Sequence, residues 1–138
     1  MVRPPILDPA RLAGTPRVTE AQLSKQVKDL LEIDGWRVFR MEPMSNVIQK
    51  RYSAELGCPD LLALRYNARR VISANYQAAY EGDILWLEIK RRGKKPAKHQ
   101  SEWHAKERAL GAEVWVVDDF DFFREGYVKS GLNRSIRA

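Results

Sequence analysis

Apolar positions along the chain fall into blocks whose spacing predicts alternating helices and strands. Between residues 23 and 31, leucine and valine recur at helical spacing, which predicts an amphipathic helix. Thr19 and Gln22 form a capping-box pattern at its start, and Gly35 is a typical helix stop. The sequence therefore predicts a helix that begins after Thr19 and ends before Gly35.

Four short apolar segments predict strands. They cover residues 36–41, 61–66, 83–90 and 113–117. A second helix is expected from about Ala97 to Leu110, and a short third helix after Asp118 and Asp119. The order is helix, three strands, helix, strand, helix, which predicts an α/β fold with a small mixed sheet flanked by helices.

The connection between the second and third predicted strands, residues 67–82, has no clear pattern. Val71 and Ile72 favour an extension of the strand, whereas residues 75–80 favour a helical turn. At the ends of the chain, residues 1–18 hold four of the seven prolines and predict an irregular arm that orders against a partner. Residues 127–138 are expected to form an exposed basic tail, which leaves 19–126 as one folded domain.

The charge balance favours a polyanionic partner. Lysine and arginine number 24 against 18 aspartates and glutamates, a net charge of +6 over 138 residues. Cys58 is the only cysteine, so an intrachain disulfide and a zinc site built on several thiolates are excluded. No apolar run approaches the roughly 20 residues of a membrane-spanning helix, and the N-terminus has no signal-peptide pattern. We expect a cytoplasmic protein without a membrane partner.

The candidate chemistry lies in the segment 84–90, where a strand pattern carries two charges. Because strands send alternate side chains to opposite faces, Glu88 and Lys90 project side by side, on the face of Trp86. Asp60 opens another predicted strand and can bring a second carboxylate to the same place. Two carboxylates and a lysine suit a hard divalent cation and a phosphate under attack, which predicts a metal-dependent nuclease.

Asp60 and Glu88 are the predicted metal ligands, and the backbone carbonyl of Ile89 is a possible third. Lys90 would orient or deprotonate the attacking water, or hold the phosphate by its charge.

Two further polar residues are predicted to point inward from helices. Glu20 shares the helical face of Leu23 and Val27 and would bind the metal directly or through water. Gln100 lies three residues before Trp103, where its amide would orient the water or Lys90. Taken singly, each candidate has a structural interpretation: an exposed charge pair for Glu88 and Lys90, a dipole partner for Glu20, a cap for Gln100 and a turn for Asp60.

In this order, the motifs resemble the PD-(D/E)XK nucleases, specifically the VRR-NUC (virus-type replication-repair nuclease) domain. The resemblance covers about residues 19–125. It runs from Thr19-Glu20 through Gly57-Cys58-Pro59-Asp60 and Leu87-Glu88-Ile89-Lys90 to His99-Gln100 and residues 110–117. It implies a restriction-endonuclease-like core, α-β-β-β-α-β, and DNA cleavage that depends on Mg²⁺ or Mn²⁺. The implied catalytic residues are Glu20, Asp60, Glu88, Lys90 and Gln100.

Small stand-alone members of this family, from phages and bacteria, resemble Holliday-junction resolvases and act as homodimers. The resemblance therefore implies a homodimeric endonuclease that acts on four-way junctions in a bacterial or phage-infected cell. The long connection 67–82 departs from the family pattern and would serve as a dimer element or a junction wedge. A flap, restriction or nicking nuclease, and a non-catalytic DNA-binding protein of the same fold, are the alternatives.

Basic residues near these motifs are expected to contact DNA phosphates, although each could equally be solvated surface. They are Lys50, Arg51, Arg91, Arg92, Lys94, Lys95 and Lys98, together with His99. Tyr76 and Tyr80 are candidates for contact with DNA or a partner, whereas Cys58 and the four tryptophans are expected in the core. His104 is expected on the surface.

Overall fold

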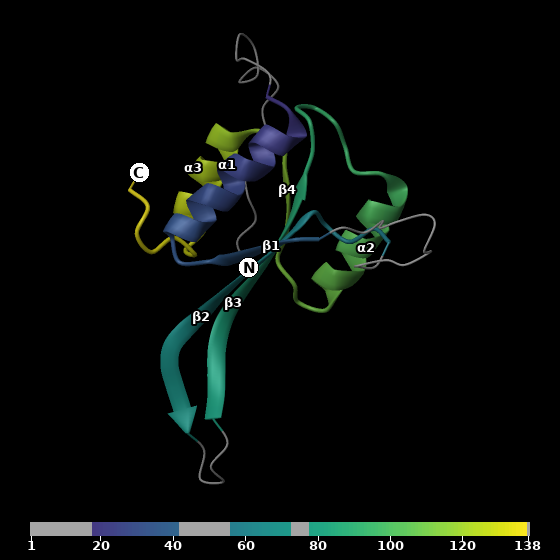
Figure 1. Ribbon diagram of the computed structural model, residues 1–138. Coiled ribbons are helices and arrows are strands. Elements are labelled where there is room, and N and C mark those ends of the chain that lie inside the picture. Colours follow the sequence, from purple (N-terminus) through teal and green to yellow (C-terminus); the bar gives the residue numbers. More distant parts are fainter. Residues whose placement is uncertain (1–17, 42–55, 73–77, 138) are drawn as a thin grey trace, which may run out of the picture.

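The computed structural model describes residues 18–41, 56–72 and 78–137, which form a four-stranded mixed sheet with helices on both faces (Figure 1). In chain order the elements are α1 (Glu20–Ile33), β1 (Arg37–Arg40), β2 (Leu61–Ile72), β3 (Ala78–Ile89), α2 (Lys98–Ala109), β4 (Val114–Val117) and α3 (Phe120–Lys129). The sheet order is β1-β2-β3-β4, antiparallel except for the parallel pair β3–β4. The predicted fold class and element order are confirmed.

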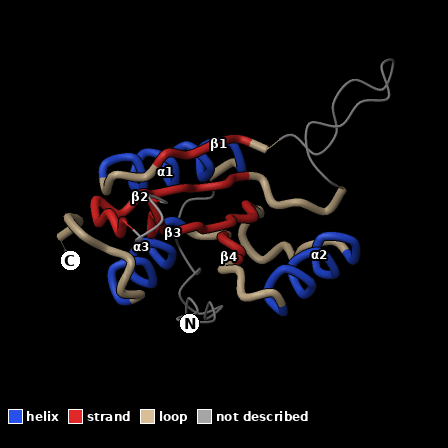
Figure 2. Tube along the Cα trace, turned by 90° about the horizontal axis from the view of Figure 1, so that it is seen from below, coloured by secondary structure: helices blue, strands red, loops and turns tan. Residues whose placement is uncertain are grey.

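Helices α1 and α3 cover one face of the sheet, and α2 covers the other (Figure 2). Strand alternation divides β3 between the two faces. Leu85, Leu87 and Ile89 enter the core beneath α1 and α3, while the ring of Trp86 lies 5.0 Å from that of Trp103 in α2. The face that carries Trp86 and Glu88 is therefore the one covered by α2, as the alternation predicts.

The start of α1 follows from local sequence. Thr19 Oγ1 accepts a hydrogen bond from Gln22 N at 3.1 Å, and Thr19 N donates to Gln22 Oε1 at 2.8 Å. This is the predicted capping box. It satisfies two backbone donors that have no partner inside the helix. It also fixes the start of α1, and with it the position of Glu20 in the first turn.

Strands β2 and β3 continue well beyond the segments predicted for them. Their pairing extends to Ile72 opposite Ala78, with an irregularity between Tyr66 and Arg70, and forms a two-stranded arm that projects from the body (Figure 1). The predicted strand extension at Val71 and Ile72 is confirmed. The predicted helical turn over residues 75–80 is wrong for 78–80, which belong to β3, because pairing with a neighbouring strand overrides a weak local pattern. Its other residues, among them Tyr76, lie outside the described part.

The C-terminal segment differs from the exposed tail expected from residue 127. Helix α3 continues to Lys129, and Leu132 and Ile136 pack against the core. The buried carboxylate of Asp34, at the end of α1, accepts hydrogen bonds from Ser135 N and Ser135 Oγ, both at 2.7 Å. A buried carboxylate is costly without donors, so Asp34 ties this segment to the body.

Arg65 completes this buried polar network from the core face of β2. It is 4% exposed and forms ion pairs with Asp34 at 3.0 Å and Asp83 at 2.9 Å. Its guanidinium lies 4.4 Å from the ring centre of Trp36 and donates to Leu132 O at 2.6 Å. Partners from several elements thus compensate the burial of this charge. None of the described helices is long and apolar enough to cross a membrane.

Candidate active site

The start of β2 and the end of β3 bring Asp60 and Glu88 together. Leu61 pairs with Leu87 across the two antiparallel strands, so the next pair along the register is Asp60 and Glu88. Asp60 Oδ2 accepts a hydrogen bond from Ile89 N at 2.8 Å, which holds this side chain against the end of β3. Two carboxyl groups from residues 28 positions apart therefore lie side by side, as the sequence predicts.

Glu88 is a fully buried acid beside Asp60. It is 0% exposed, and neither of its carboxyl oxygens has a partner among the described residues. Burial, followed by the interaction with Asp60, raises the pKa of Glu88 to about 9 and outweighs the opposing charge of Lys90. The carboxyl group is therefore neutral at pH 7 in the metal-free protein.

The donor chemistry of this pair fits a hard divalent cation. Unpartnered carboxyl oxygens are the ligands that Mg²⁺ and Mn²⁺ take, and Mg²⁺ is commonly held by one or two carboxylates with water and phosphate oxygens. In the described part of the chain, no group of three or more His, Cys, Asp or Glu side chains lies close enough to hold a metal ion. Asp60 and Glu88 would thus need oxygens from water, backbone or substrate to complete a coordination shell.

Lys90 projects beside this pair at the end of β3. It is half-buried, and its backbone nitrogen donates to Val117 O at 2.9 Å, which continues the β3–β4 pairing past the strand. Its charge acts on both Glu88 and His104. An ammonium group at this point can attract a phosphate to the carboxyl pair.

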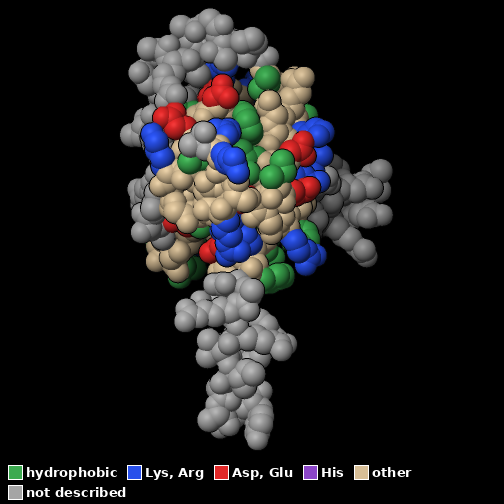
Figure 3. Space-filling model, turned by 90° about the vertical axis from the view of Figure 1, so that its left-hand side faces the viewer, with side chains coloured by type: hydrophobic (Ala, Val, Ile, Leu, Met, Phe, Trp, Pro, Cys, Tyr) green, Lys and Arg blue, Asp and Glu red, His purple; other side chains and the backbone are tan. Residues whose placement is uncertain are grey.

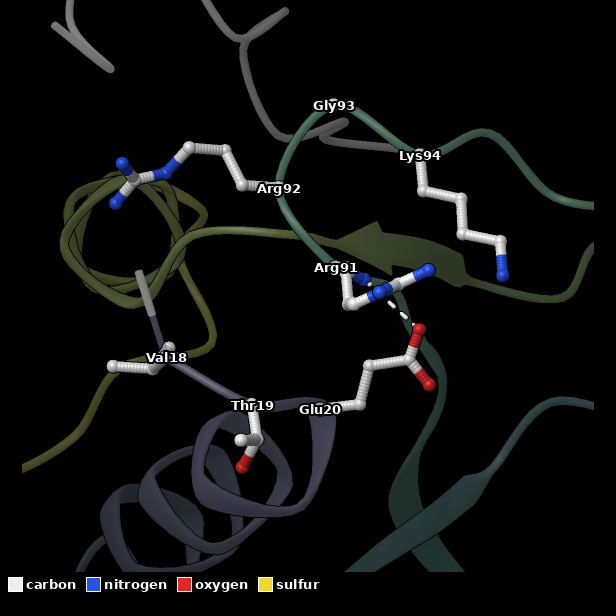
Figure 4. A pocket seen from close by; sticks show the side chains of 7 residues that line it. All are labelled: Val18, Thr19, Glu20, Arg91, Arg92, Gly93 and Lys94. Atoms are coloured by element: carbon white, nitrogen blue, oxygen red, sulfur yellow. Dashed lines mark hydrogen bonds between the residues drawn. The ribbon is translucent and has the colours of Figure 1, made fainter. Parts of the chain in front are cut away.

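Glu20 reaches the same end of the sheet from the first turn of α1. Its Oε1 accepts a hydrogen bond from Arg91 N at 3.0 Å, as Figure 4 shows. The start of α1 and the loop after β3 border a hollow of about 990 Å³. It is lined by Val18, Thr19, Glu20, Arg91, Arg92, Gly93 and Lys94. Three of these seven residues are basic, so the hollow suits an anion. After β3 its lining begins at Arg91, the next residue after Lys90, and it includes neither Asp60 nor Glu88.

Gln100 serves the start of α2 in this structure. Its Oε1 accepts a hydrogen bond from Ala97 N at 2.8 Å, which is the capping role that the sequence leaves open for it. The side chain is half-buried, but no hydrogen bond joins it to Asp60, Glu88 or Lys90 in the described residues. The structure thus places Gln100 at the helix start and not in the carboxyl pair.

His104 is buried, which corrects the expectation of a surface residue. It is 2% exposed, and its Nε2 lies 3.8 Å from Glu88 Oε1. Burial and the charges of Arg108 and Lys90 lower the pKa of His104 to about 4, so its ring is neutral at pH 7. One sequence signal points to it: His104 follows Gln100 by four positions and therefore shares its helical face.

The predicted phosphate contacts are distributed unevenly. Arg91 and Lys94 are exposed in the hollow, whereas Arg92 is half-buried and pairs with Asp119 at 3.7 Å. Lys95, Lys98 and His99 are exposed beyond it, with Lys98 3.9 Å from Glu102. Lys50 and Arg51 lie outside the described residues. On the face seen in Figure 3, basic and acidic side chains are interspersed, so that face shows no patch of a single sign.

Gly57 fixes the approach of the chain to Asp60. Its φ is +89°, and an added Cβ would lie 2.6 Å from His99 O. We expect Gly57→Ala to lower the free energy of unfolding by about 2–4 kcal/mol, from left-handed backbone strain and this collision, and to be detected by urea denaturation. Gly111→Ala is the matched control, because φ is +98° there and nothing lies within 4 Å of the added Cβ. Equal losses in the two variants would contradict the proposed collision.

Comparison with known proteins supports the fold. No family model and no curated protein matches this sequence. A solved structure described as a VRR_NUC domain matches with 26% sequence identity and a TM-score of 0.52, covering 80% of this chain and 94% of that chain. The resemblance that the sequence motifs predict is therefore confirmed at the level of structure.

Proposed function

We propose that this chain, which shares the fold of a VRR_NUC domain, is a metal-dependent DNA nuclease of the PD-(D/E)XK type. The observation that carries the proposal is the pairing of half-buried Asp60 with fully buried Glu88, both of whose oxygens are without partners among the described residues. Lys90 lies at the same strand end, and the lining of the basic hollow includes the next residue, Arg91. The carboxyl groups suit a bound cation, and the basic residues suit the negative charge of a phosphodiester.

The protein's own groups divide the work as follows. Asp60 and Glu88 would hold Mg²⁺ or Mn²⁺, with the Ile89 carbonyl as a further ligand and Glu20 as a direct or water-mediated one. When bound, such an ion supplies an activated water and neutralises charge on the phosphate. Lys90 would orient or deprotonate the attacking water, or hold the phosphate by charge. The oxygen of Gln100 caps α2, so its NH₂ group would donate to the water, whereas orienting Lys90 would require the second lone pair of that oxygen.

Glu88 would hold a metal ion only in its ionised form. The neutral state of Glu88 in the metal-free protein avoids burying its charge next to the carboxyl group of Asp60. The protein can thus fold without a metal ion, and its two carboxyl groups can still become the anionic ligands of one.

The preferred substrate in our proposal is a four-way DNA junction, cut by a homodimer. A junction has two-fold symmetry, and two active sites related by a two-fold axis can nick opposite strands. The net charge of +6 suits a phosphate backbone. The arm formed by β2 and β3 extends from the body at a place where a branched substrate or a second copy could meet it.

The test of this function is cleavage of labelled four-way junction, flap and linear duplex by the purified protein, in Mg²⁺, in Mn²⁺ and in EDTA. Symmetric nicking of the junction alone, dependent on metal, is the expected result. Equal cutting of all three substrates would retain the nuclease and reject the junction preference. Tight binding without any cutting would favour a non-catalytic DNA-binding protein.

The basic hollow should contribute to DNA affinity by neutralising phosphates. We expect the double variant Arg91→Ala/Lys94→Ala to bind duplex DNA about 10-fold more weakly at low salt. The slope of log K against log salt should become shallower by about 1 for each phosphate that the variant no longer neutralises. Fluorescence anisotropy over a salt series measures both quantities.

A charge-matched control distinguishes this local effect from net charge. Lys25→Ala/Lys129→Ala removes the same charge from exposed positions on α1 and α3, outside the lining of the hollow. Equal weakening by the two double variants would show that total charge, and not the hollow, governs binding.

A further inference from the structure

His104 and Glu88 face each other in the interior, one from α2 and one from β3. They are 2% and 0% exposed, respectively. His104 Nε2 and both oxygens of Glu88 have no hydrogen-bond partner among the described residues, although Nε2 and Glu88 Oε1 are only 3.8 Å apart. Buried polar atoms are normally satisfied, so two neighbouring groups left open point to a state in which they are joined.

Packing alone does not account for a histidine here. The ring of His104 lies 6.4 Å from that of Trp103, edge to face, and a leucine or phenylalanine would fill the same region without leaving a nitrogen unsatisfied. A neutral imidazole carries one N–H and can place it on Nε2. It would then be a donor directed at the acid that we propose as a metal ligand.

We propose that His104 is a positioning residue of the metal site, which donates a hydrogen bond from Nε2 to Glu88 Oε1 when a cation occupies the site and leaves Oε2 for the ion. This inference rests on the proposed function. The present separation exceeds a normal N–H···O distance by about 0.9 Å, which small side-chain rotations can close. Since Asp60, Glu88 and His104 do not form a three-ligand group in the described structure, His104 acts through Glu88 and not on the ion itself.

Groups that hydrogen-bond to a metal-binding carboxylate affect its affinity for the metal, because they fix the orientation of the carboxylate. Their removal typically costs 10- to 100-fold in metal affinity. His104 is well placed for this because Glu88 receives no hydrogen bond from any other described residue, whereas Asp60 is already held by Ile89 N. Of the two acids, Glu88 is therefore the one that lacks a support.

The test is calorimetric titration of Mn²⁺ into the full-length protein and its variants, without DNA. We expect His104→Leu to raise the Kd for Mn²⁺ by 10- to 100-fold. His104→Gln should restore most of the affinity, because its amide N–H can occupy the position of Nε2. Ser101→Leu is the matched control on the exposed first turn of α2 and should bind Mn²⁺ as the wild type does.

Urea unfolding of the metal-free variants separates positioning from a structural role. A positioning role predicts that His104→Leu is at least as stable as the wild type, since it removes an unsatisfied buried nitrogen. Lower stability with an unchanged Kd for Mn²⁺ would overturn the inference, as would equal Kd values for wild type and His104→Leu. A leucine variant that does not fold would contradict this expected stability, and His104→Phe would then test the affinity alone, with the same expected loss. Failure of the wild type itself to bind Mn²⁺ would overturn the proposed function, and this inference with it.

Discussion

Replacing Glu88 by glutamine is expected to abolish DNA cleavage and, at the same time, to stabilise the metal-free protein. Cleavage should fall by about 10³-fold or more, because an amide cannot supply the anionic ligand that the proposed ion needs. Stability should rise because the folded protein keeps Glu88 neutral in a fully buried position, and glutamine is neutral at every pH. Gain in stability with loss of function is the mark of a group retained for chemistry.

The sign of the stability effect follows from the raised pKa. Glu88 has a pKa of about 9 in the folded protein against an ordinary value of 4.5, so the folded state binds its proton more tightly than the unfolded state. The resulting stabilisation is complete below pH 4.5 and is lost as pH rises from there to about 9. At pH 7.5, three units above the ordinary pKa, we therefore expect Glu88→Gln to raise the free energy of unfolding by about 4 kcal/mol, with little difference near pH 4.

Urea denaturation at pH 4 and at pH 7.5, with a cleavage assay, measures these effects. Glu102→Gln is the matched control, because its side chain is 63% exposed on α2 and should change neither property. A Glu88→Gln protein that is less stable than the wild type at pH 7.5, or that cuts DNA at the wild-type rate, would be inconsistent with this role for Glu88.

The second large effect is expected at Asp34, far from the carboxyl pair. Asp34→Ala should lower the free energy of unfolding by about 3–5 kcal/mol, the usual cost of breaking a buried ion pair from one side. The substitution leaves Arg65 with one acid fewer and removes the acceptor of the hydrogen bond from Tyr127. It also removes the acceptor for the backbone nitrogens of Arg134 and Ser135, which donate to Asp34 at 3.0 Å and 2.7 Å.

Chemical denaturation compares this variant with Asp29→Ala on the same helix. Asp29 is 51% exposed and pairs with Lys25 at 2.6 Å, so its loss should cost no more than about 0.5 kcal/mol. Burial opposes ionisation of Asp34, but hydrogen bonds from Tyr127, Ser135 and Arg134 outweigh it and lower the pKa of Asp34 below 3.8. Its contribution is present above that pH and is lost below it. Similar small losses for both variants would mean that the buried network does not hold the C-terminal segment.

The sequence predicts the parts of this molecule that depend on local periodicity. The capping box at Thr19 and the core face of α1 follow from spacing along one helix. The shared face of Glu88 and Lys90 follows from alternation along one strand. The meeting of Asp60 with Glu88 needs only the further assumption that two predicted strands pair at their ends, and the structure places both there.

What the sequence does not predict depends on contacts between distant segments. The β2–β3 arm is held by pairing between backbones, which leaves little trace in side-chain pattern. Asp34 is buried because donors 100 and 101 positions later come to meet it. His104 is missed because the inner face of α2 is largely polar, with His104 its one buried residue, so no apolar stripe marks which side faces the sheet.

Gln100 shows how a correct spacing argument can still miss a contact. Its position on the helix is the predicted one, and its side chain is half-buried. The first turn of α2 has a backbone donor to satisfy at Ala97, and the nearest acceptor is Gln100 Oε1. The side-chain oxygen of Gln100 therefore caps the helix, although the helical periodicity predicts that this side chain points into the site.

The most direct test of the central claim is cleavage of labelled DNA by the purified protein in Mg²⁺ beside EDTA, with Glu88→Gln in parallel. We expect cut product with the wild type in Mg²⁺, none in EDTA, recovery when Mg²⁺ is restored, and none with the variant in any condition. Cleavage that persists in EDTA, or that Glu88→Gln carries out as well as the wild type, would contradict a metal-dependent site built on Asp60 and Glu88.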